Sequence, residues 1–147
     1  MTVFLDTSAL IALLDANEAR HTDASLLWTQ LLESDSRVET TNYVLVETYA
    51  LAQRRLGSAA VRVLTDDLLA VVEVEWVGRE LHERAVSALV AASRRELSLV
   101  DVVSFAVMRQ RGVTRAFAFD HHFEDAGFEI VVADQSDAGR AGDVGPD

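Results

Sequence analysis

Short apolar runs and stretches with helical periodicity follow one another along this chain. Residues 3–5 and 116–119 are short apolar runs of the kind found in buried strands. The stretch VVEVEWV at 71–77 alternates with period two, which predicts a strand near the edge of a sheet. Apolar residues gathered on one helical face at 21–34 and 78–95 predict amphipathic helices. The same reading predicts further strands at 37–40 and 128–132, helices at 8–16, 42–56, from 58 onward and at 99–110, and a helical turn at 121–127.

Local signals mark where several of these helices begin and end. A hydroxyl side chain is expected to cap the helix at 8–16, and Thr41 or Asn42 is expected to cap the helix that follows them. Gly57 and Gly112 are expected to end the helices that precede them. The predicted order of elements is therefore β-α-α-β-α-α-β-α-α-β-α-β.

This order predicts an α/β fold, a three-layer sandwich with a largely parallel central sheet. Strands that are joined through helices pair in parallel, and the helices cover both faces of the sheet. Residues 1–134 are expected to form a single domain. From Gln135 the chain turns to Gly, Asp and Ser and holds its one proline, so 135–147 are expected to be a disordered tail.

Composition limits the classes of protein to which the chain can belong. With 147 residues, 50% of them hydrophobic, it is long enough for one domain with a substantial core. It has no cysteine, which excludes disulfides and thiolate metal sites. The chain enters a strand pattern directly, and no apolar run approaches the roughly 20 residues of a membrane span. We therefore expect a soluble, cytoplasmic protein that does not enter a membrane.

The charge balance argues against a broad basic surface for nucleic acid. The formal net charge is −11 at pH 7, which disfavours binding to a polyanion. All 13 basic residues are arginine, however, and several are clustered, at 54–55, 94–95 and 109–115. These clusters are either a coding bias with solvated helix ends, or guanidinium groups that grip phosphates at a few places.

Four carboxylates occupy positions that need an explanation. Asp6 and Asp120 each follow an apolar strand directly, at the sheet edge where ligands bind in parallel α/β folds. Glu47 shares a helical stripe with apolar residues, and Asp101 lies within the most apolar helix of the chain. A single residue of this kind is typically a helix cap or the partner of a buried arginine. Four carboxylates at one sheet edge would repel one another, and a divalent cation is the simplest way to neutralise them.

Four stretches of the chain, in this order and spacing, give the most specific signal. They are DTSAL at 6–10, TTNYVLVET at 40–48, LSLVDVVSFAVMRQRG at 97–112 and AFAFDHHFEDAGFEIV at 116–131. Together they resemble the motifs of the PIN domain family, in the arrangement of the small bacterial VapC toxins. Each motif alone is a weak signal, whereas four in the right order are a strong one, and the resemblance covers residues 2–133.

The resemblance implies an activity and a site. Such toxins cleave RNA internally with Mg²⁺ or Mn²⁺, cations for which oxygen ligands are suited and which can activate a water for attack on phosphorus. The resemblance makes these four carboxylates catalytic: Asp6, Glu47, Asp101 and Asp120. Three of them, Asp6, Asp101 and Asp120, are the expected metal ligands. The expected supporting residues are Thr7, Ser8, Asn42 and His122.

One position departs from the family pattern. Many relatives have a second acidic residue two positions after the one that matches Asp120, where this chain has His122. Its imidazole could ligate a metal, bind a phosphate when protonated, or pack beside Phe123. Whether the site holds one metal ion or two is therefore left open.

The resemblance also implies partners. VapC-type toxins are made with a small antitoxin that blocks the site, and they commonly dimerise, so we expect a VapB-type antitoxin, a homodimer and an RNA substrate. Two alternatives remain within the family: an RNA-processing PIN nuclease without an antitoxin, and a PIN-like scaffold that only binds a partner. A receiver domain or a phosphatase with a phospho-aspartate is a rival from another class. Receivers need a lysine near the pocket, and this chain has no lysine.

Overall fold

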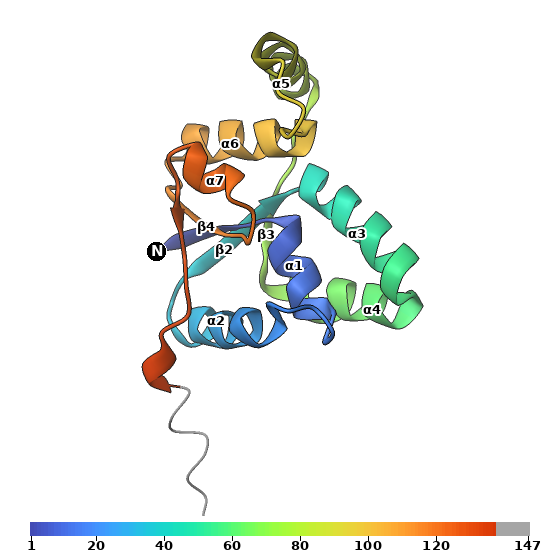
Figure 1. Ribbon diagram of the computed structural model, residues 1–147, viewed down its shortest axis with the longest axis vertical. Helices are drawn as coiled ribbons and strands as arrows, with labels where there is room; N and C mark the ends of the chain where they lie inside the picture. Colours follow the sequence, from blue (N-terminus) through green and yellow to red (C-terminus); the bar gives the residue numbers. More distant parts are fainter. Residues whose placement is uncertain (138–147) are drawn as a thin grey trace, which may run out of the picture.

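The computed structural model describes residues 1–137, and its centre is a five-stranded sheet whose paired strands all run parallel (Figure 1). The strands are β1 (Thr2–Leu5), β2 (Arg37–Thr41), β3 (Glu73–Glu75), β4 (Arg115–Phe117) and β5 (Glu129–Ile130). Their order in the sheet is β3-β2-β1-β4-β5, so the sheet grows to one side of β1 through β2 and β3 and to the other side through β4 and β5. This topology confirms the predicted α/β sandwich.

Helices cover both faces of this sheet. The described residues form α1 (Thr7–Leu14), α2 (His21–Glu33), α3 (Asn42–Leu56), α4 (Ser58–Val63), α5 (Arg79–Ala92), α6 (Leu99–Arg111) and α7 (His122–Asp125), with short helical segments η1 (Leu64–Leu68), η2 (Leu69–Val71) and η3 (Gln135–Asp137). In Figure 1, α1 and α2 lie on one side of the sheet, whereas α6 and α7 lie on the other, and α5 packs on the outside of α6. Helix α3 starts at the carboxyl end of β2 and contacts both α1 and α6.

The core lies on both sides of β1, the central strand. Its residues Val3, Phe4 and Leu5 are completely buried, which explains the unbroken apolar run at the start of the chain. On the α6 side, the rings of Phe105 and Phe123 meet edge to face with their centres 5.0 Å apart. This contact fastens the short helix α7 to α6.

Several strands are shorter than the sequence predicts. β3 and β5 span only three and two residues, and both are edge strands that pair on one side alone. The strand predicted at 116–119 ends at Phe117, so Phe119 and Asp120 lie in the loop beyond it. The tail predicted to be disordered starts at Gln135, but its first residues, Gln135–Asp137, form the short helical segment η3. Residues 138–147 lie outside the described residues, so for them the expectation stays a prediction.

The helix caps agree with the prediction except at the first helix. There the carboxylate of Asp6, and not a hydroxyl, caps α1 by accepting a hydrogen bond from the backbone N–H of Ser8. Thr41, one of the two predicted candidates, caps α3. Gly57 and Gly112 follow α3 and α6 with positive φ angles of 86° and 69°, which favour glycine.

Most of the clustered arginines near the end of α6 are engaged in ion pairs. Glu39 is 2% exposed in β2, and the Nε atom of Arg111 lies 3.0 Å from its Oε1 atom. The Nη1 atom of Arg111 also lies 3.1 Å from the Oε2 atom of Glu75, and Arg115 pairs with Glu129. A buried carboxylate needs such a partner. The guanidinium group of Arg111 is therefore structural, and the phosphate-gripping interpretation does not apply to it.

Within residues 1–137, no helix combines the length and the apolar character that crossing a membrane requires.

Candidate active site

Four carboxylates line one pocket at the carboxyl ends of β1 and β4. Asp6 follows β1 directly and Asp120 lies in the loop after β4, and these two strands are neighbours in the sheet. Glu47 comes from α3, and Asp101 comes from the first turn of α6. The pocket has a volume of about 430 Å³. It lies beside β1, the strand at which the strand order switches, because the strands that follow it are added first on the β2 side and later on the β4 side. Ligands bind at such a switch point in parallel α/β sheets.

Asp6 is buried and is held by the helix that it caps. Its Oδ2 atom accepts hydrogen bonds from the Ser8 backbone N–H at 3.2 Å and from the Ser8 hydroxyl at 2.6 Å. Burial raises the pKa of the Asp6 carboxyl to about 6, although the bonds from Ser8 act in the opposite direction, and the charge of Asp101 adds to the rise. Ionised Asp6 is thus costly in this pocket unless a cation joins it.

Asp101 is a helix cap and a pocket carboxylate at once. Its Oδ2 atom accepts a hydrogen bond from the Ser98 backbone N–H at 3.1 Å, and its own N–H donates to the Ser98 hydroxyl at 3.1 Å. This reciprocal pair is a capping box at the start of α6. The side chain is buried, so the cap holds this carboxyl group in the wall of the pocket.

Glu47 is half-buried on the α3 side of the pocket. Burial raises the pKa of its carboxyl, and the like charges of Asp101 and Asp120 raise it further, while the Thr7 hydroxyl partly opposes this. A carboxyl with a raised pKa, close to other acids, is suited to exchange a proton with a bound reactant.

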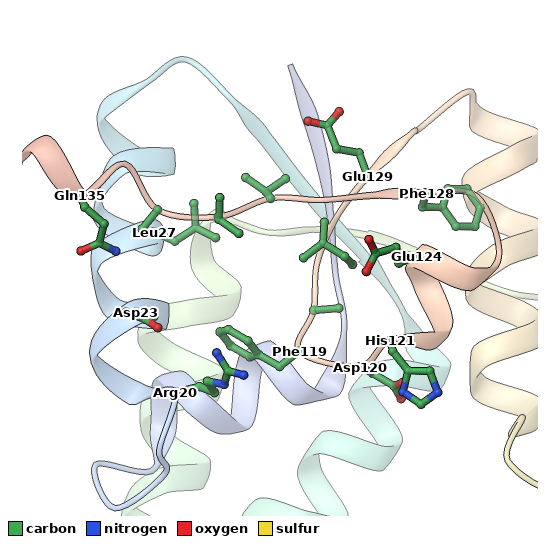
Figure 2. Close-up of a pocket in the computed structure, with 15 residues that line it drawn as sticks. Arg20, Asp23, Leu27, Phe119, Asp120, His121, Glu124, Phe128, Glu129 and Gln135 are labelled. Carbon is green, nitrogen blue, oxygen red and sulfur yellow. The ribbon is translucent and has the colours of Figure 1, made fainter.

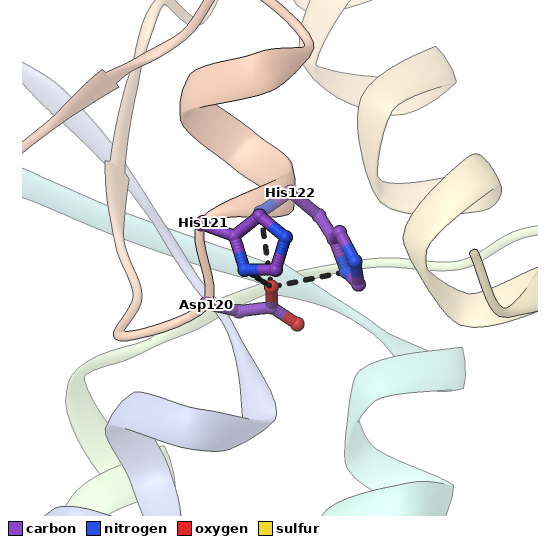
Figure 3. A group of neighbouring side chains, drawn as sticks. All are labelled: Asp120, His121 and His122. Carbon is purple, nitrogen blue, oxygen red and sulfur yellow. Dashed lines mark hydrogen bonds and ion pairs between the residues drawn. The ribbon is translucent and has the colours of Figure 1, made fainter. Parts of the chain in front are cut away.

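Asp120 lies beside two histidines (Figure 3). His122 Nδ1 is 3.0 Å from Asp120 Oδ1 and 3.6 Å from Asp101 Oδ2, and His121 Nδ1 is 3.7 Å from Asp120 Oδ1. One possible ligand atom from each of Asp120, His121 and His122 can be chosen so that all three lie within 4.8 Å of one another. The His121 side chain is 72% exposed, whereas that of His122 is only 9% exposed.

The two expected supporting hydroxyls join the elements around the pocket. Ser8 Oγ accepts a hydrogen bond of 2.9 Å from the backbone N–H of Phe119, which connects the loop after β4 to α1. Thr7 Oγ1 accepts a hydrogen bond of 3.2 Å from Thr48 Oγ1, which connects α1 to α3. Both Thr7 and Ser8 line the pocket.

Asn42 does not line the pocket. Its Oδ1 atom accepts a hydrogen bond of 2.7 Å from the Val77 backbone N–H, and its Nδ2 atom donates one of 3.4 Å to the Val77 carbonyl. These two bonds tie the start of α3 to the chain after β3. Any support that Asn42 gives to the site is therefore indirect, through the position of the helix that carries Glu47.

The donor set of the pocket fits a divalent cation. Within residues 1–137, no arginine forms an ion pair with Asp6, Glu47 or Asp101. Uncompensated carboxylates in a partly buried pocket are unfavourable, and hard cations such as Mg²⁺ and Mn²⁺ take oxygen ligands. The carboxylates suited to hold the ion are those of Asp6, Asp101 and Asp120.

A second hollow adjoins the acid pocket, and Phe119 and Asp120 line both (Figure 2). It has a volume of about 570 Å³ and lies between α2, the loop after β4 and residues 128–133. The guanidinium carbon of Arg20 lies 5.7 Å from the centre of the Phe119 ring. Arg20 makes no ion pair within residues 1–137. A guanidinium that is held on an aromatic ring in this way can bind a phosphate.

Sequence reasoning missed several residues at this site. Ser98 had a signal, because the stretch SLVD at 98–101 has the spacing of a capping box. Arg55 lines the pocket, and the sequence indicated it only as part of the arginine pair at 54–55, one of the clusters that could bind phosphates. Arg20 belongs to the loop before α2, and nothing in the local pattern indicated its contact with Phe119.

Comparison with known proteins gives close relatives. The family model described as PIN domain matches residues 3–129. In Mycobacterium tuberculosis, strains CDC 1551 / Oshkosh and ATCC 25618 / H37Rv, the proteins named "23S rRNA-specific endonuclease VapC20" are 46% identical to this chain over 130 residues. The match covers 88% of this chain and 97% of theirs.

Solved structures agree with this match. The crystal structure of Mycobacterium tuberculosis VapC20, described as a Sarcin-Ricin loop cleaving toxin, has a TM-score of 0.78 at 44% identity and covers 88% of this chain and 98% of its own. The crystal structure of VapBC2 from Rickettsia felis, bound to a DNA fragment from its promoter, has a TM-score of 0.67 at 10% identity and covers 89% of this chain and 98% of its own. The crystal structure of FitAcB from Neisseria gonorrhoeae has a TM-score of 0.62 at 14% identity and covers 88% of this chain and 96% of its own. The last two similarities concern the fold alone.

Proposed function

Because the chain belongs to the PIN domain family, we propose that it is a metal-dependent endoribonuclease that acts as the toxin of a type II toxin-antitoxin pair. The observation that carries this proposal is the gathering of four carboxylates in one pocket at the carboxyl ends of β1 and β4. Hydrolysis of an RNA phosphodiester bond with a divalent cation uses such a pocket without a protein nucleophile.

Each carboxylate has a proposed role. Asp6, Asp101 and Asp120 hold the metal, and Glu47, whose pKa is raised by burial, exchanges a proton with the reacting groups. Bound there, Mg²⁺ or Mn²⁺ would supply an activated water and would neutralise negative charge on the phosphate. The helix caps at Asp6 and Asp101 keep these two carboxylates in place before the substrate arrives.

The RNA backbone is proposed to cross the acid pocket between two arginines. Arg55 lines the pocket on the α3 side, and Arg20 is held on Phe119 at the border with the second hollow. With a net charge of −11, the protein has to attract RNA locally, so these two groups are proposed to bind the phosphates on either side of the scissile bond.

For the substrate we propose 23S rRNA, with its sarcin-ricin loop as the first candidate. The support is the likeness to VapC20, which is 46% identical over most of both chains and is named for that RNA and that loop. For partners we propose a VapB-type antitoxin that brings positive charge to the acid pocket, and a second copy of this chain in a homodimer. The cytoplasm, which holds the ribosomes, is the proposed place of action.

A cleavage assay tests this function. Purified protein is incubated with ribosomes and with free 23S rRNA in Mg²⁺, in Mn²⁺ and in excess EDTA, and the 5′ ends of the products are mapped by primer extension. We expect cleavage at one or a few positions with either metal, none with EDTA, and none with Asp6→Asn. A protein that cleaves no RNA and gains no stability from Mn²⁺ would instead be a scaffold.

A growth assay tests the toxin assignment separately. Expression of the chain alone should arrest growth, and co-expression of the small protein encoded beside it should relieve the arrest. Asp6→Asn should be harmless and should still bind that partner. RNA cleavage in vitro without growth arrest at verified expression would favour an RNA-processing nuclease.

A further inference from the structure

His122 carries two ring nitrogens that the protein leaves unused. Within residues 1–137, neither nitrogen has a hydrogen-bond partner, although the side chain is only 9% exposed. The contact of Nδ1 with Asp120 has the distance of an ion pair but not the alignment of a hydrogen bond. A buried polar group without a partner is rare in folded proteins and points to a ligand.

The positions around Nδ1 suit a metal ion. His122 Nδ1 and Asp120 Oδ1 are 3.0 Å apart, and Asp101 Oδ2 is 3.6 Å from the same nitrogen. Two ligands at right angles on an octahedral ion, each at about 2.1 Å, lie about 3.0 Å apart. The nitrogen and the Asp120 oxygen are therefore spaced as two adjacent ligands of one ion, whereas the Asp101 side chain, 3.6 Å from the nitrogen, would have to move closer to join them.

The fold keeps the imidazole in this position. The backbone N–H of His122 donates a hydrogen bond of 2.9 Å to Asp120 Oδ1, which fixes the start of α7 against the loop after β4. The next residue, Phe123, is completely buried and packs edge to face on Phe105 of α6. His122 does not itself line the acid pocket: it lies in the hollow between α5, α6 and α7, and from there its Nδ1 atom faces the carboxylates of Asp101 and Asp120.

We propose that His122 is a metal ligand through Nδ1 and that, with Asp120 and Asp101, it gives the pocket a cation position with mixed nitrogen and oxygen ligands. Because imidazole suits Mn²⁺ better than it suits the hard Mg²⁺ ion, this position prefers Mn²⁺. The proposal rests on the proposed function only in that the acid pocket binds a divalent cation. It concerns which atoms bind the ion and which metal they prefer.

His121 is the natural control, because it is adjacent in sequence and also near Asp120. Its side chain is exposed, and its Nε2 atom lies 3.7 Å from Asp125 Oδ2. If the metal took its nitrogen from the exposed ring, substitution of His121 and not of His122 would change the metal site.

Pulsed electron paramagnetic resonance of bound Mn²⁺, without RNA, tests the proposal. Coordinated imidazole adds a ¹⁴N modulation to the Mn²⁺ spin echo. We expect this modulation in the wild type and in His121→Ala, and its loss in His122→Gln. Competition titrations should show that the preference for Mn²⁺ over Mg²⁺ narrows in His122→Asp, which restores an oxygen ligand.

Three outcomes would overturn the proposal: no ¹⁴N modulation in the wild type, modulation that persists in His122→Gln, or modulation that disappears in His121→Ala. Circular dichroism spectra and melting curves verify that each variant is folded, and His122→Asn replaces His122→Gln if the latter fails to fold. Failure of the proposed function looks different. If the protein shows the ¹⁴N modulation but cleaves no RNA, the His122 metal site stands and the proposed nuclease function is wrong. If the protein cleaves RNA but shows no modulation, the nuclease function stands and the His122 metal site is wrong.

Discussion

The hydroxyl of Ser8 donates a hydrogen bond of 2.6 Å to Asp6 Oδ2, so the carboxylate at the end of β1 depends on a residue of the helix that it caps. The Ser8 hydroxyl oxygen in turn accepts a hydrogen bond of 2.9 Å from the backbone N–H of Phe119, in the loop that carries Asp120. The Ser8 hydroxyl therefore connects the Asp6 carboxylate to the loop after the neighbouring strand, in addition to the backbone hydrogen bond from Asp6 N–H to the Phe117 carbonyl. Its loss should affect the metal site and the fold together.

Replacing Ser8 by alanine should weaken metal binding and stability. The bonds from Ser8 lower the pKa of Asp6, so their loss should raise it further and make ionisation harder. We expect Ser8→Ala to cost about 1–2 kcal/mol in the free energy of unfolding, since a hydrogen bond to a charged group is lost, and to weaken Mn²⁺ binding. Urea denaturation and calorimetric titration measure the two effects. Ser8→Thr keeps a hydroxyl and should retain much of both, and equal losses in both variants would contradict the hydrogen-bond explanation.

Asp6 should make the stability of the metal-free protein depend on pH. Its pKa is raised from 3.8 to about 6 on folding, so the folded protein holds this proton more tightly than the unfolded chain does. Protonation of Asp6 therefore stabilises the folded state, fully below about pH 4, and this contribution is lost as the pH rises through about 6. A pKa difference of two units corresponds to about 3 kcal/mol in the free energy of unfolding. Melting curves in EDTA from pH 4.5 to 8 should show this fall, and it should be smaller in Asp6→Asn. An Asp6→Asn protein that is less stable than the wild type at pH 7 would mean that ionised Asp6 has a structural role.

Mn²⁺ should reverse this trend. A cation binds the ionised carboxylates, so its binding competes with protons and strengthens as the pH rises through about 6. An ion that binds only the folded state adds about 2.7 kcal/mol at a hundred times its Kd. We expect the Mn²⁺-induced rise in Tm to be small at pH 5 and large at pH 7, and to shrink in Asp101→Asn. Glu129→Gln, at an exposed carboxylate on β5, is the control and should respond as the wild type does.

The sequence was sufficient to predict the sheet, the helix order and the four pocket carboxylates, because each depends on local periodicity and on the topology of parallel sheets. Asp6 could be placed at a strand end, but its role as the cap of α1 could not be separated from that of the hydroxyls that follow it. Phe119 was predicted inside a strand, since its apolar character does not reveal that β4 ends at Phe117. The contact of Arg20 with Phe119 joins residues about a hundred positions apart, and no local pattern reports on that.

Asn42 should matter for stability and not for metal binding. Its amide makes two hydrogen bonds to the backbone of Val77 and lies outside the pocket lining. We expect Asn42→Ala to lower the free energy of unfolding by about 1–2 kcal/mol, because the backbone of Val77 loses its hydrogen-bond partner. The Kd for Mn²⁺ should stay within a factor of about two, because the substituted side chain does not contact the metal site. Urea denaturation and calorimetric titration test this. Asn17→Ala, at an exposed asparagine, is the control, and a loss of Mn²⁺ binding in Asn42→Ala comparable to that of Asp6→Asn would place the amide in the site itself.

Arg20 and Arg55 should each contribute one phosphate contact to RNA binding. Each guanidinium that neutralises a phosphate of a single strand adds about 0.7 to the slope of log K against log salt, through counterion release. In the cleavage-deficient Asp6→Asn background, we expect Arg20→Ala and Arg55→Ala each to weaken binding of a fluorescent RNA and to lower this slope by about 0.7. Fluorescence anisotropy at several salt concentrations gives both quantities.

The neighbouring residue on α3 provides a matched control for this prediction. Arg54 is exposed like Arg55 but lies about 100° around the helix from it and does not line the pocket. Arg54→Ala should therefore leave the salt slope unchanged. Phe119→Leu should reduce the contribution of Arg20 without removing its charge, since the ring that holds the guanidinium in place is lost. Equal salt slopes for the Arg20, Arg54 and Arg55 variants would mean that RNA follows another path across the protein. An unchanged RNA affinity in Phe119→Leu would mean that the contact with the ring does not help Arg20 to bind a phosphate.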